Sequence, residues 1–187
     1  QSSNAGSPYG FFGVVGDTDK SKAQFDEIVI KNINFANVDI NIGDSNMLGI
    51  AVGADVKAAK IKNDRVNSSY SGNITIEGIT TSGSVVCTNG ASIGGIAGRF
   101  ETTGDLTIKN CTNNAELVLS SSGNSHIKAG GILGFTQNRG KSTKFIGCKS
   151  NGAITVDTTA TECHVGGLVS FDGSSRYPIF DNSCAVS

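Results

Sequence analysis

The chain has 187 residues, with 15 basic and 16 acidic side chains and a formal net charge of -1 at pH 7. This balance excludes a general electrostatic attraction to nucleic acid or to an anionic membrane. No apolar run approaches the roughly 20 residues that a membrane helix needs, so we expect no membrane insertion. The length suits one domain, and we expect a single β-solenoid domain over residues 1–187 that is a segment of a longer chain or assembly.

The composition favours many short strands over helices. The chain contains 25 glycines, two prolines, one methionine and no tryptophan. Short runs of β-branched residues are interrupted by Gly, Asn and Ser throughout, which is typical of strands joined by tight turns. We therefore predict an all-β protein.

A glycine-rich apolar motif recurs five times along the chain. The copies occupy residues 12–16, 48–53, 94–98, 130–134 and 166–170. When Gly13, Gly49, Gly95, Gly131 and Gly167 are taken as equivalent, the intervals are 36, 46, 36 and 36 residues. On this alignment the second copy has one residue inserted between Gly49 and Gly53. A fixed interval of this length indicates a stack of structural repeats.

A second segment follows each copy of the motif, and a third follows the first four copies. Apolar residues alternate and then meet a turn at residues 28–33, 74–79, 106–111, 143–148 and 179–184. A third alternating segment occurs at residues 38–42, 84–87, 115–119 and 153–157. Alternation indicates a strand with one buried face, and Asn or Gly suits the tight bends between strands.

These patterns predict a right-handed parallel β-helix (β-solenoid) of about five coils, with three short strands in each repeat of about 36 residues. One repeat cannot bury its own apolar face, whereas stacked coils pair equivalent strands about 4.7–4.9 Å apart. A β-propeller needs four strands in each blade, and a leucine-rich repeat needs 20–29 residues and a Leu frame. A β-sandwich does not explain the regular interval.

The segments Gly94-Gly95-Ile96-Ala97-Gly98 and Gly130-Gly131-Ile132-Leu133-Gly134 resemble the GLUG-type repeats of bacterial surface proteins. The resemblance covers nearly the whole chain. It implies a secreted or cell-surface scaffold of the kind found in adhesin-like proteins. It carries over no catalytic residue, because the repeat itself has none.

The sequence predicts no catalytic, cofactor-binding or metal-binding residue. Cys163, His164 and His126 are candidate zinc ligands that could lie near one corner of adjacent coils, but we identify no fourth ligand. Enzymes that cleave polysaccharides need clustered carboxylates, or a basic residue near a bound cation, on one face. Asp39, Asp105, Asp157 and Asp181 instead fall at different repeat positions, so we expect no enzyme.

The chain has five cysteines, an odd number. Cys111 and Cys148 occupy the same repeat position, which places them within disulfide distance in stacked coils. Side chains that stack in register point in parallel, which disfavours the disulfide dihedral. We expect a buried ladder of free thiols, extended by Cys184 or Ser183.

The main insertion lies around residues 55–71 and carries basic side chains together with an aromatic one: Lys57, Lys60, Lys62, Arg65 and Tyr70. It is either an electropositive binding loop or a solvated excursion. The sequence is consistent with a non-catalytic extracellular scaffold, most simply an adhesin-like segment whose solenoid face binds a glycan or a protein. The alternatives are a structural stalk or fibre subunit that pairs end to end with other copies and, more distantly, a polysaccharide-acting enzyme.

Overall fold

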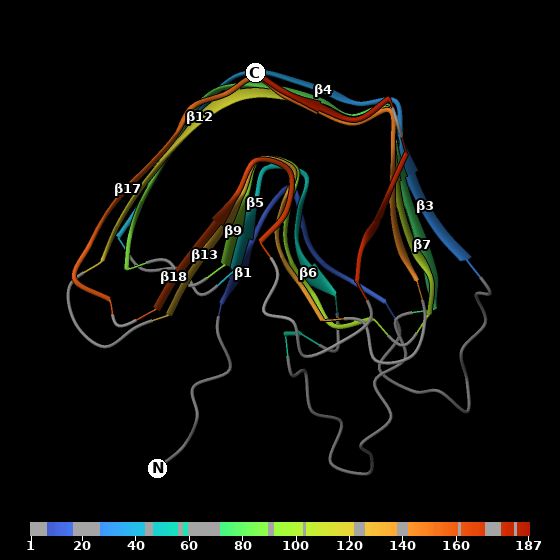
Figure 1. The fold of residues 1–187 in the computed structure, drawn as a ribbon, viewed down its shortest axis with the longest axis horizontal. Helices are drawn as coiled ribbons and strands as arrows, with labels where there is room; N and C mark the ends of the chain where they lie inside the picture. The colour runs from blue at the N-terminus through green and yellow to red at the C-terminus, as the bar shows by residue number, and fades with distance from the viewer. Residues whose placement is uncertain are drawn as a thin grey trace, which may run out of the picture.

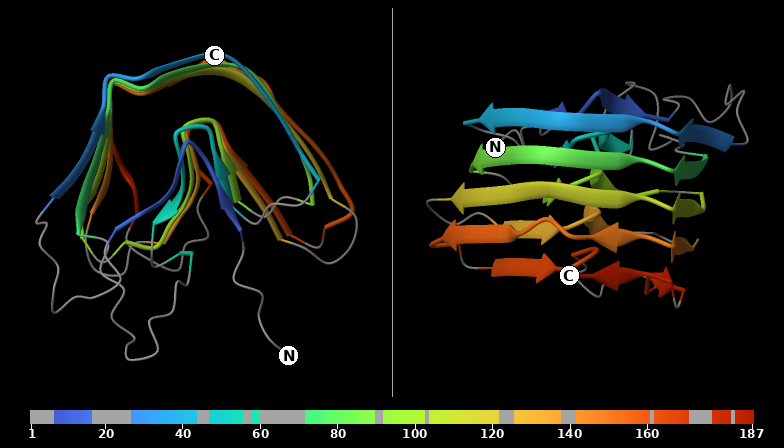
Figure 2. Two further views of the ribbon diagram at one scale, coloured as in Figure 1. Left: turned by 180° about the vertical axis from the view of Figure 1, so that it is seen from behind. Right: turned by 90° about the horizontal axis from the view of Figure 1, so that it is seen from above.

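The computed structural model describes residues 7–16, 27–43, 47–55, 58–59, 72–89, 92–102, 104–121, 126–137, 142–160, 162–170, 177–181 and 183–187. These residues form strands and turns without a helix, and every strand pair is parallel. Equivalent strands of five successive coils stack in register (Figure 1, Figure 2). The predicted all-β class and the parallel β-solenoid architecture are confirmed.

The first two strands of each coil form an inner arch, in which a glycine-rich turn joins two legs. One leg is built from β1 (Pro8–Tyr9), β5 (Met47–Gly49), β9 (Ser92–Gly94), β13 (His126–Gly130) and β18 (Glu162–Gly166). The other leg is built from β2 (Phe12–Val15), β6 (Val52–Asp55), β10 (Ala97–Phe100) and β14 (Leu133–Thr136). Among the described residues of the last coil, this leg is represented by a bridge between Leu133 and Val169.

The remaining strands form an outer arch that surrounds the inner arch (Figure 1). Its shorter side contains β3 (Glu27–Lys31), β7 (Asn73–Glu77), β11 (Leu106–Lys109), β15 (Thr143–Ile146) and β19 (Ile179–Phe180). Its longer side contains β4 (Asn34–Ile42), β8 (Thr80–Thr88), β12 (Thr112–Ser121), β16 (Lys149–Ser150), β17 (Ile154–Thr158) and β20 (Ala185–Val186).

The repeat thus contains four strands, and the predicted number of three is wrong. The glycine-rich motif, expected to be one strand, contains two strands that belong to different sheets. A side chain on Gly94 would collide with the carbonyl oxygen of Ala97, so only glycine permits the chain to reverse so sharply here. The tight turn converts one apolar run into the two legs of the inner arch.

The strand register also corrects the alignment of the first two repeats. Tyr9 pairs with Leu48, Leu48 with Ile93, Ile93 with Ala129, and Ala129 with Val165. The coils are therefore 39, 45, 36 and 36 residues apart. In the second copy no residue is inserted, because Gly49 pairs with Gly94 and Val52 with Ala97. Gly13 and Gly49, which the sequence alignment takes as equivalent, do not pair with each other in the sheets.

The inner arch divides the interior into two apolar cores. The larger core lies between its β6–β10–β14 leg and the shorter side of the outer arch, and includes Phe100, Ile76, Ile108 and Phe145. The smaller core lies between its other leg and the longer side, and its buried members are Leu48, Ile50, Val85, Cys87, Ile93, Ala115, Leu117, Leu119, Ile127 and Ala129. Burying each large aliphatic or aromatic side chain contributes about 1.5–3 kcal/mol.

The tip of the inner arch touches the middle of the outer arch, and glycine makes this contact possible. A side chain on Gly95 would overlap the side chain of Asn113, and one on Gly131 would overlap that of Ser150. Asn113 is fully buried, and its amide both accepts from and donates to the backbone of Ala115. Because Gly95 and Gly131 have no side chains, the arch tip can approach the buried side chains of Asn113 on β12 and Ser150 on β16.

The cysteine ladder is confirmed. Cys111 and Cys148 are free and buried at equivalent positions, and Cys184, also free, continues the ladder at half-buried depth. The Cys148 thiol lies 3.3 Å from the carbonyl oxygen of Ile108 in the neighbouring coil. A hydrogen bond with Cys111, followed by burial, raises the pKa of the Cys148 thiol, so it remains protonated at neutral pH. The thiols act as small core side chains.

We expect Gly95→Ala to destabilise the fold by about 1–3 kcal/mol, because the added methyl overpacks the contact between the arch tip and Asn113. Gly43→Ala is the matched control, since nothing lies within 4 Å of a side chain added there. Urea unfolding of both variants measures the difference. Equal midpoints would show that the arch tip does not depend on close approach.

Candidate functional site

The space between the two legs of the inner arch is lined by side chains that face away from both cores. On β5, β9 and β13 the residues Leu48, Ile93 and Ala129 point into the smaller core. Their neighbours Met47, Ser92 and Lys128 form a row in register with one another. Because successive side chains of a strand point to opposite faces, this second row faces the opposite leg.

In the second coil this space is filled with apolar side chains. Met47 packs with Ala54, Ala58 and Ala59, and Val14 of the first coil covers them. The turn that carries the alanines is held by Asp55, whose carboxylate accepts from the N–H of Ala58 at 2.9 Å. The arch is therefore closed at this level.

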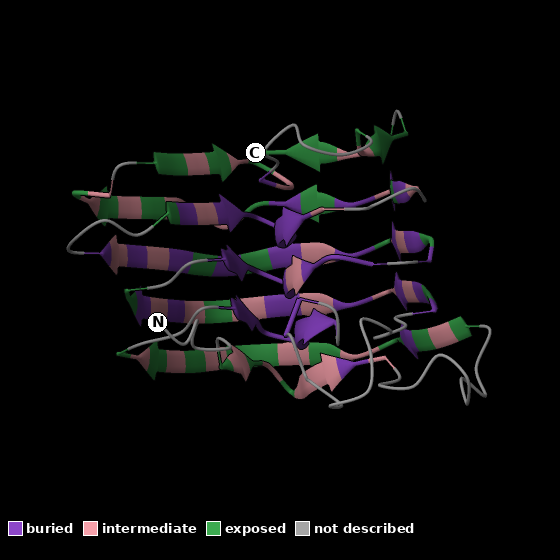
Figure 3. Cartoon of the chain, turned by 90° about the horizontal axis from the view of Figure 1, so that it is seen from below, coloured by how far each residue is buried: buried purple, intermediate pink, exposed green. Residues whose placement is uncertain are grey.

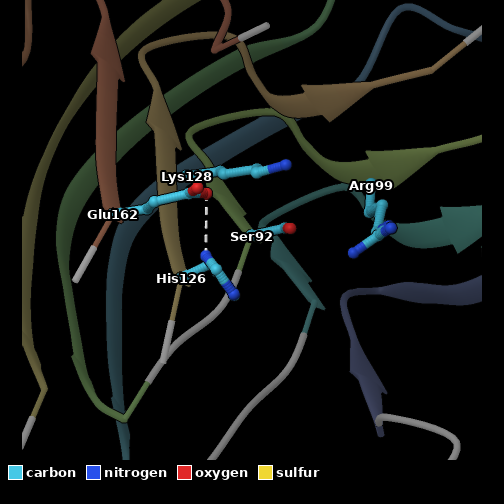
Figure 4. A pocket seen from close by; sticks show the side chains of 5 residues that line it. All are labelled: Ser92, Arg99, His126, Lys128 and Glu162. Carbon is cyan, nitrogen blue, oxygen red and sulfur yellow. Dashed lines mark hydrogen bonds and ion pairs between the residues drawn. The ribbon is translucent and has the colours of Figure 1, made fainter. Parts of the chain in front are cut away.

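In the third and fourth coils the same space opens into a hollow of about 350 Å³. Its lining contains Ser92, Arg99, His126, Lys128 and Glu162 (Figure 4). The hollow appears at this level because Ser92 replaces Met47 in the register and Arg99 replaces Ala54 on the opposite leg. Four strands from three coils supply these side chains, so rigid sheets hold the site.

Two cations lie against one aromatic ring at the side of the hollow. The Arg99 guanidinium carbon is 4.7 Å from the Phe135 ring centroid, and the Lys128 ammonium nitrogen is 4.0 Å from it. Arg99 also donates from Nε and Nη2 to one oxygen of Glu101, at 2.9 and 2.6 Å. These contacts fix the orientation of the guanidinium and hold positive charge beside the hollow.

The opposite side of the hollow contains a carboxylate between two imidazoles. Glu162 Oε2 is 2.8 Å from His126 Nδ1 and 3.8 Å from His164 Nε2. Both pairs are more than one-third exposed, so they orient the side chains more than they stabilise the fold. The dashed line in Figure 4 marks the contact between His126 and Glu162.

The Ser92 hydroxyl has no hydrogen-bond partner among the described residues, although Ser92 is fully buried. In Figure 4 it points from β9 toward the side on which Arg99 lies. A buried hydroxyl without a partner costs about 1–3 kcal/mol relative to a satisfied one. The Ser92 hydroxyl is therefore able to form a hydrogen bond with a molecule other than the described chain.

The residue types Ser92, His126 and Glu162 also occur in hydrolytic triads. Such a triad needs a hydrogen bond from the nucleophile to the imidazole and another from the imidazole to the carboxylate. Here only the second exists, because the Ser92 hydroxyl bonds to nothing described. The arrangement as it stands suits recognition of a polar ligand.

The candidate zinc ligands are not brought together as one set. His126 and His164 lie near the same Glu162, as expected for residues of adjacent coils. Cys163 pairs with the core-facing Ile127, so it points to the other side of its strand. Within the described residues no group of three His, Cys, Asp or Glu side chains is placed to hold a metal ion.

The other candidate residues do not enter the hollow. Asp105 accepts from the N–H and hydroxyl of Ser142 at 2.9 and 3.0 Å, and Asp181 from the N–H of Gly147 at 3.1 Å. The hydroxyl of Ser183 and the N–H of Gly147 lower the pKa of Asp181, which suits a turn-stabilising carboxylate. The basic residues of the insertion, from Lys57 to Arg65, and Tyr70 lie outside the described residues.

Sequence reasoning missed Ser92, Arg99, Lys128 and Glu162. The signal was present in the repeat register: one leg reads Met47, Ser92, Lys128 and His164 at a position where the interior of a solenoid is usually apolar. The opposing leg reads Val14, Ala54, Arg99 and Phe135. Only the division of the glycine-rich motif into two facing strands shows that these rows meet.

A second hollow, of about 320 Å³, lies at the ends of β8, β12 and β17. Hydroxyl and amide side chains line it, among them Thr88, Ser120 and Thr158. Thr158 accepts from the N–H of Ala160 at 2.8 Å and donates to the carbonyl of Ser121 at 3.4 Å. These groups satisfy local backbone positions, so the hollow between the legs is the stronger candidate.

Comparisons with protein-family models, with curated proteins and with solved structures find no match for this chain. In the described part of the chain, no helix has the length and apolar character needed to cross a bilayer. The inference of function therefore depends on the geometry of the solenoid and its hollow.

We expect Ser92→Ala to raise the free energy of unfolding by about 1 kcal/mol, because it removes a buried hydroxyl that lacks a partner. Thr81→Val is the contrasting variant. Its hydroxyl is equally buried but donates to Asn113 at 2.8 Å, so the change should cost about 1–2 kcal/mol. Thermal unfolding should separate the two by several degrees. A loss of stability in Ser92→Ala would show that its hydroxyl is satisfied.

Proposed function

We propose that this chain is a non-catalytic extracellular scaffold, an adhesin-like β-solenoid segment that binds a glycan or a protein on the face where the inner arch opens. The observation that carries the proposal is the polar hollow between the legs, with the unpartnered hydroxyl of Ser92 inside it. Stacked parallel strands hold its side chains in fixed positions, which lowers the entropic cost of recognition. The resemblance to GLUG-type repeats supports a secreted or cell-surface location.

The distribution of polar groups supports binding over catalysis. Among the described residues the hollow has one carboxylate, Glu162, whereas most enzymes that hydrolyse a glycosidic bond use a pair of carboxyl groups flanking the bond. The described side chains around it are donors and acceptors from four strands of three coils, with the imidazole of His126 already bonded to Glu162. Such a set can orient a ligand without transferring a group.

The wild-type chain should retain particular ligands on a mixed glycan and protein array, and Ser92→Met should lose them. This variant reproduces the filled arrangement of the second coil, where Met47 is buried at the equivalent position. Lys149→Gln, on the exposed outer arch, is the control and should bind normally. Chromatography of the bound saccharides should show no shorter product. An array that remains empty at high chain concentration would contradict the proposal.

A second candidate function is a stalk or fibre subunit in which copies stack end to end. The large apolar side chains that the structure describes as exposed all lie in the first or last coil: Tyr9, Phe11, Val29, Val165, Tyr177, Ile179, Phe180 and Val186. Figure 3 shows the buried residues concentrated in the middle coils. Several of these side chains continue the core columns, since Phe180 follows Phe145 and stacks on it at 5.0 Å.

If copies dock end to end, light scattering should show a mass that grows with concentration, because both end coils also present unpaired strand edges. Phe180→Lys and Val29→Lys, at opposite ends, should each keep the chain monomeric. Thr155→Lys on the exposed face of β17 is the control and should assemble like wild type. A constant monomer mass for the wild-type chain would exclude assembly.

A further inference from the structure

We infer that the hollow between the legs of the inner arch binds the acid group of a saccharide, a carboxylate or a sulfate. The inference rests on the proposed binding function and specifies its ligand class. Three hydrogen-bond donors face the hollow from different strands: the Ser92 hydroxyl, the Lys128 ammonium and the Arg99 guanidinium. An oxyanion is the chemical group that complements such a set.

The positive charges are held in place without a ligand. Lys128 and Arg99 come from opposite legs and both rest against Phe135, which is almost fully buried. The hydrogen bonds of Arg99 to Glu101 use two of the five N–H donors of the guanidinium. A planar fork that is already oriented loses little entropy when its remaining donors meet an oxyanion.

Ser92 contributes the neutral donor that completes the site. Its hydroxyl is buried and lacks a partner, so a ligand oxygen gains a hydrogen bond without displacing one that the protein makes. The adjacent residue in the ladder, Met47, shows that the same position accepts an apolar side chain in the preceding coil. The fold therefore does not require a hydroxyl at this register position, and the hydroxyl of Ser92 is particular to the level at which the hollow opens.

The other side of the hollow suits the hydroxyls of a sugar ring. The carboxylate of Glu162 accepts hydrogen bonds, and the imidazoles of His126 and His164 flank it. The described side chains of the lining are all polar or charged, and the nearby ring of Phe135 carries the two cations on its face. A volume of about 350 Å³ is near the lower limit for ligand sites, which favours one or two sugar units.

The test is calorimetric titration of the chain with trigalacturonate, with its fully methyl-esterified neutral form, and with a sulfated trisaccharide. We expect the acid to bind at least tenfold more tightly than the ester, and its affinity to fall as sodium chloride increases. Comparison of the carboxylated and sulfated probes identifies which acid group is preferred. Lys128→Gln should weaken the acid about tenfold, and Ser92→Met should abolish binding, whereas Lys149→Gln should not change it.

Thermal unfolding of each variant confirms that loss of binding is not loss of fold. Equal affinity for acid and ester, acid binding that Ser92→Met leaves intact, or no binding of either acid would overturn the inference. Binding of a tetraglutamate peptide in place of the saccharides would overturn the saccharide class. Retention of neutral glycans on the array by both wild type and Lys128→Gln would leave the proposed function standing while this inference fails.

Discussion

The close approach of the inner arch to the outer arch is the contact on which the rest of this solenoid depends. The arch tip reaches the start of β12 because Gly95 has no side chain to meet Asn113, and the same holds one coil later for Gly131 and Ser150. The contact divides the interior into two apolar cores. It also leaves a space between the legs that belongs to neither core.

That space is where the coils differ from one another. In-register stacking places the same residue position of each coil in one column, so the chemistry of a column changes only when the residue changes. One column runs from Met47 through Ser92 and Lys128 to His164, and the arch is accordingly apolar and closed at one level and polar and hollow at the next. A binding site can thus arise in a repeat scaffold through substitutions at two facing register positions, here Ser92 for Met47 and Arg99 for Ala54.

The polar groups of the hollow differ in whether they have hydrogen-bond partners within the chain. His126 and Arg99 have acidic partners, Glu162 and Glu101, that orient them. Ser92 has none among the described residues and is buried nonetheless. A group of this kind lowers stability locally and is retained most readily where a ligand satisfies it, which links the energetics of the fold to the proposed recognition of an oxyanion.

The sequence by itself determined the all-β class, the stack of five coils, the alternating core strands and the free thiols at Cys111 and Cys148. Each of these follows from residue periodicity, which is local or repeats at a regular interval. It did not determine the fourth strand or the alignment of the first two repeats, because both depend on where the chain reverses between Gly94 and Ala97. The sequence did not predict the hollow either, for the same reason. Ser92 and Arg99 are seven residues apart in the sequence, and only the tertiary structure makes them face each other, since the glycine turn places them on opposite legs of one arch.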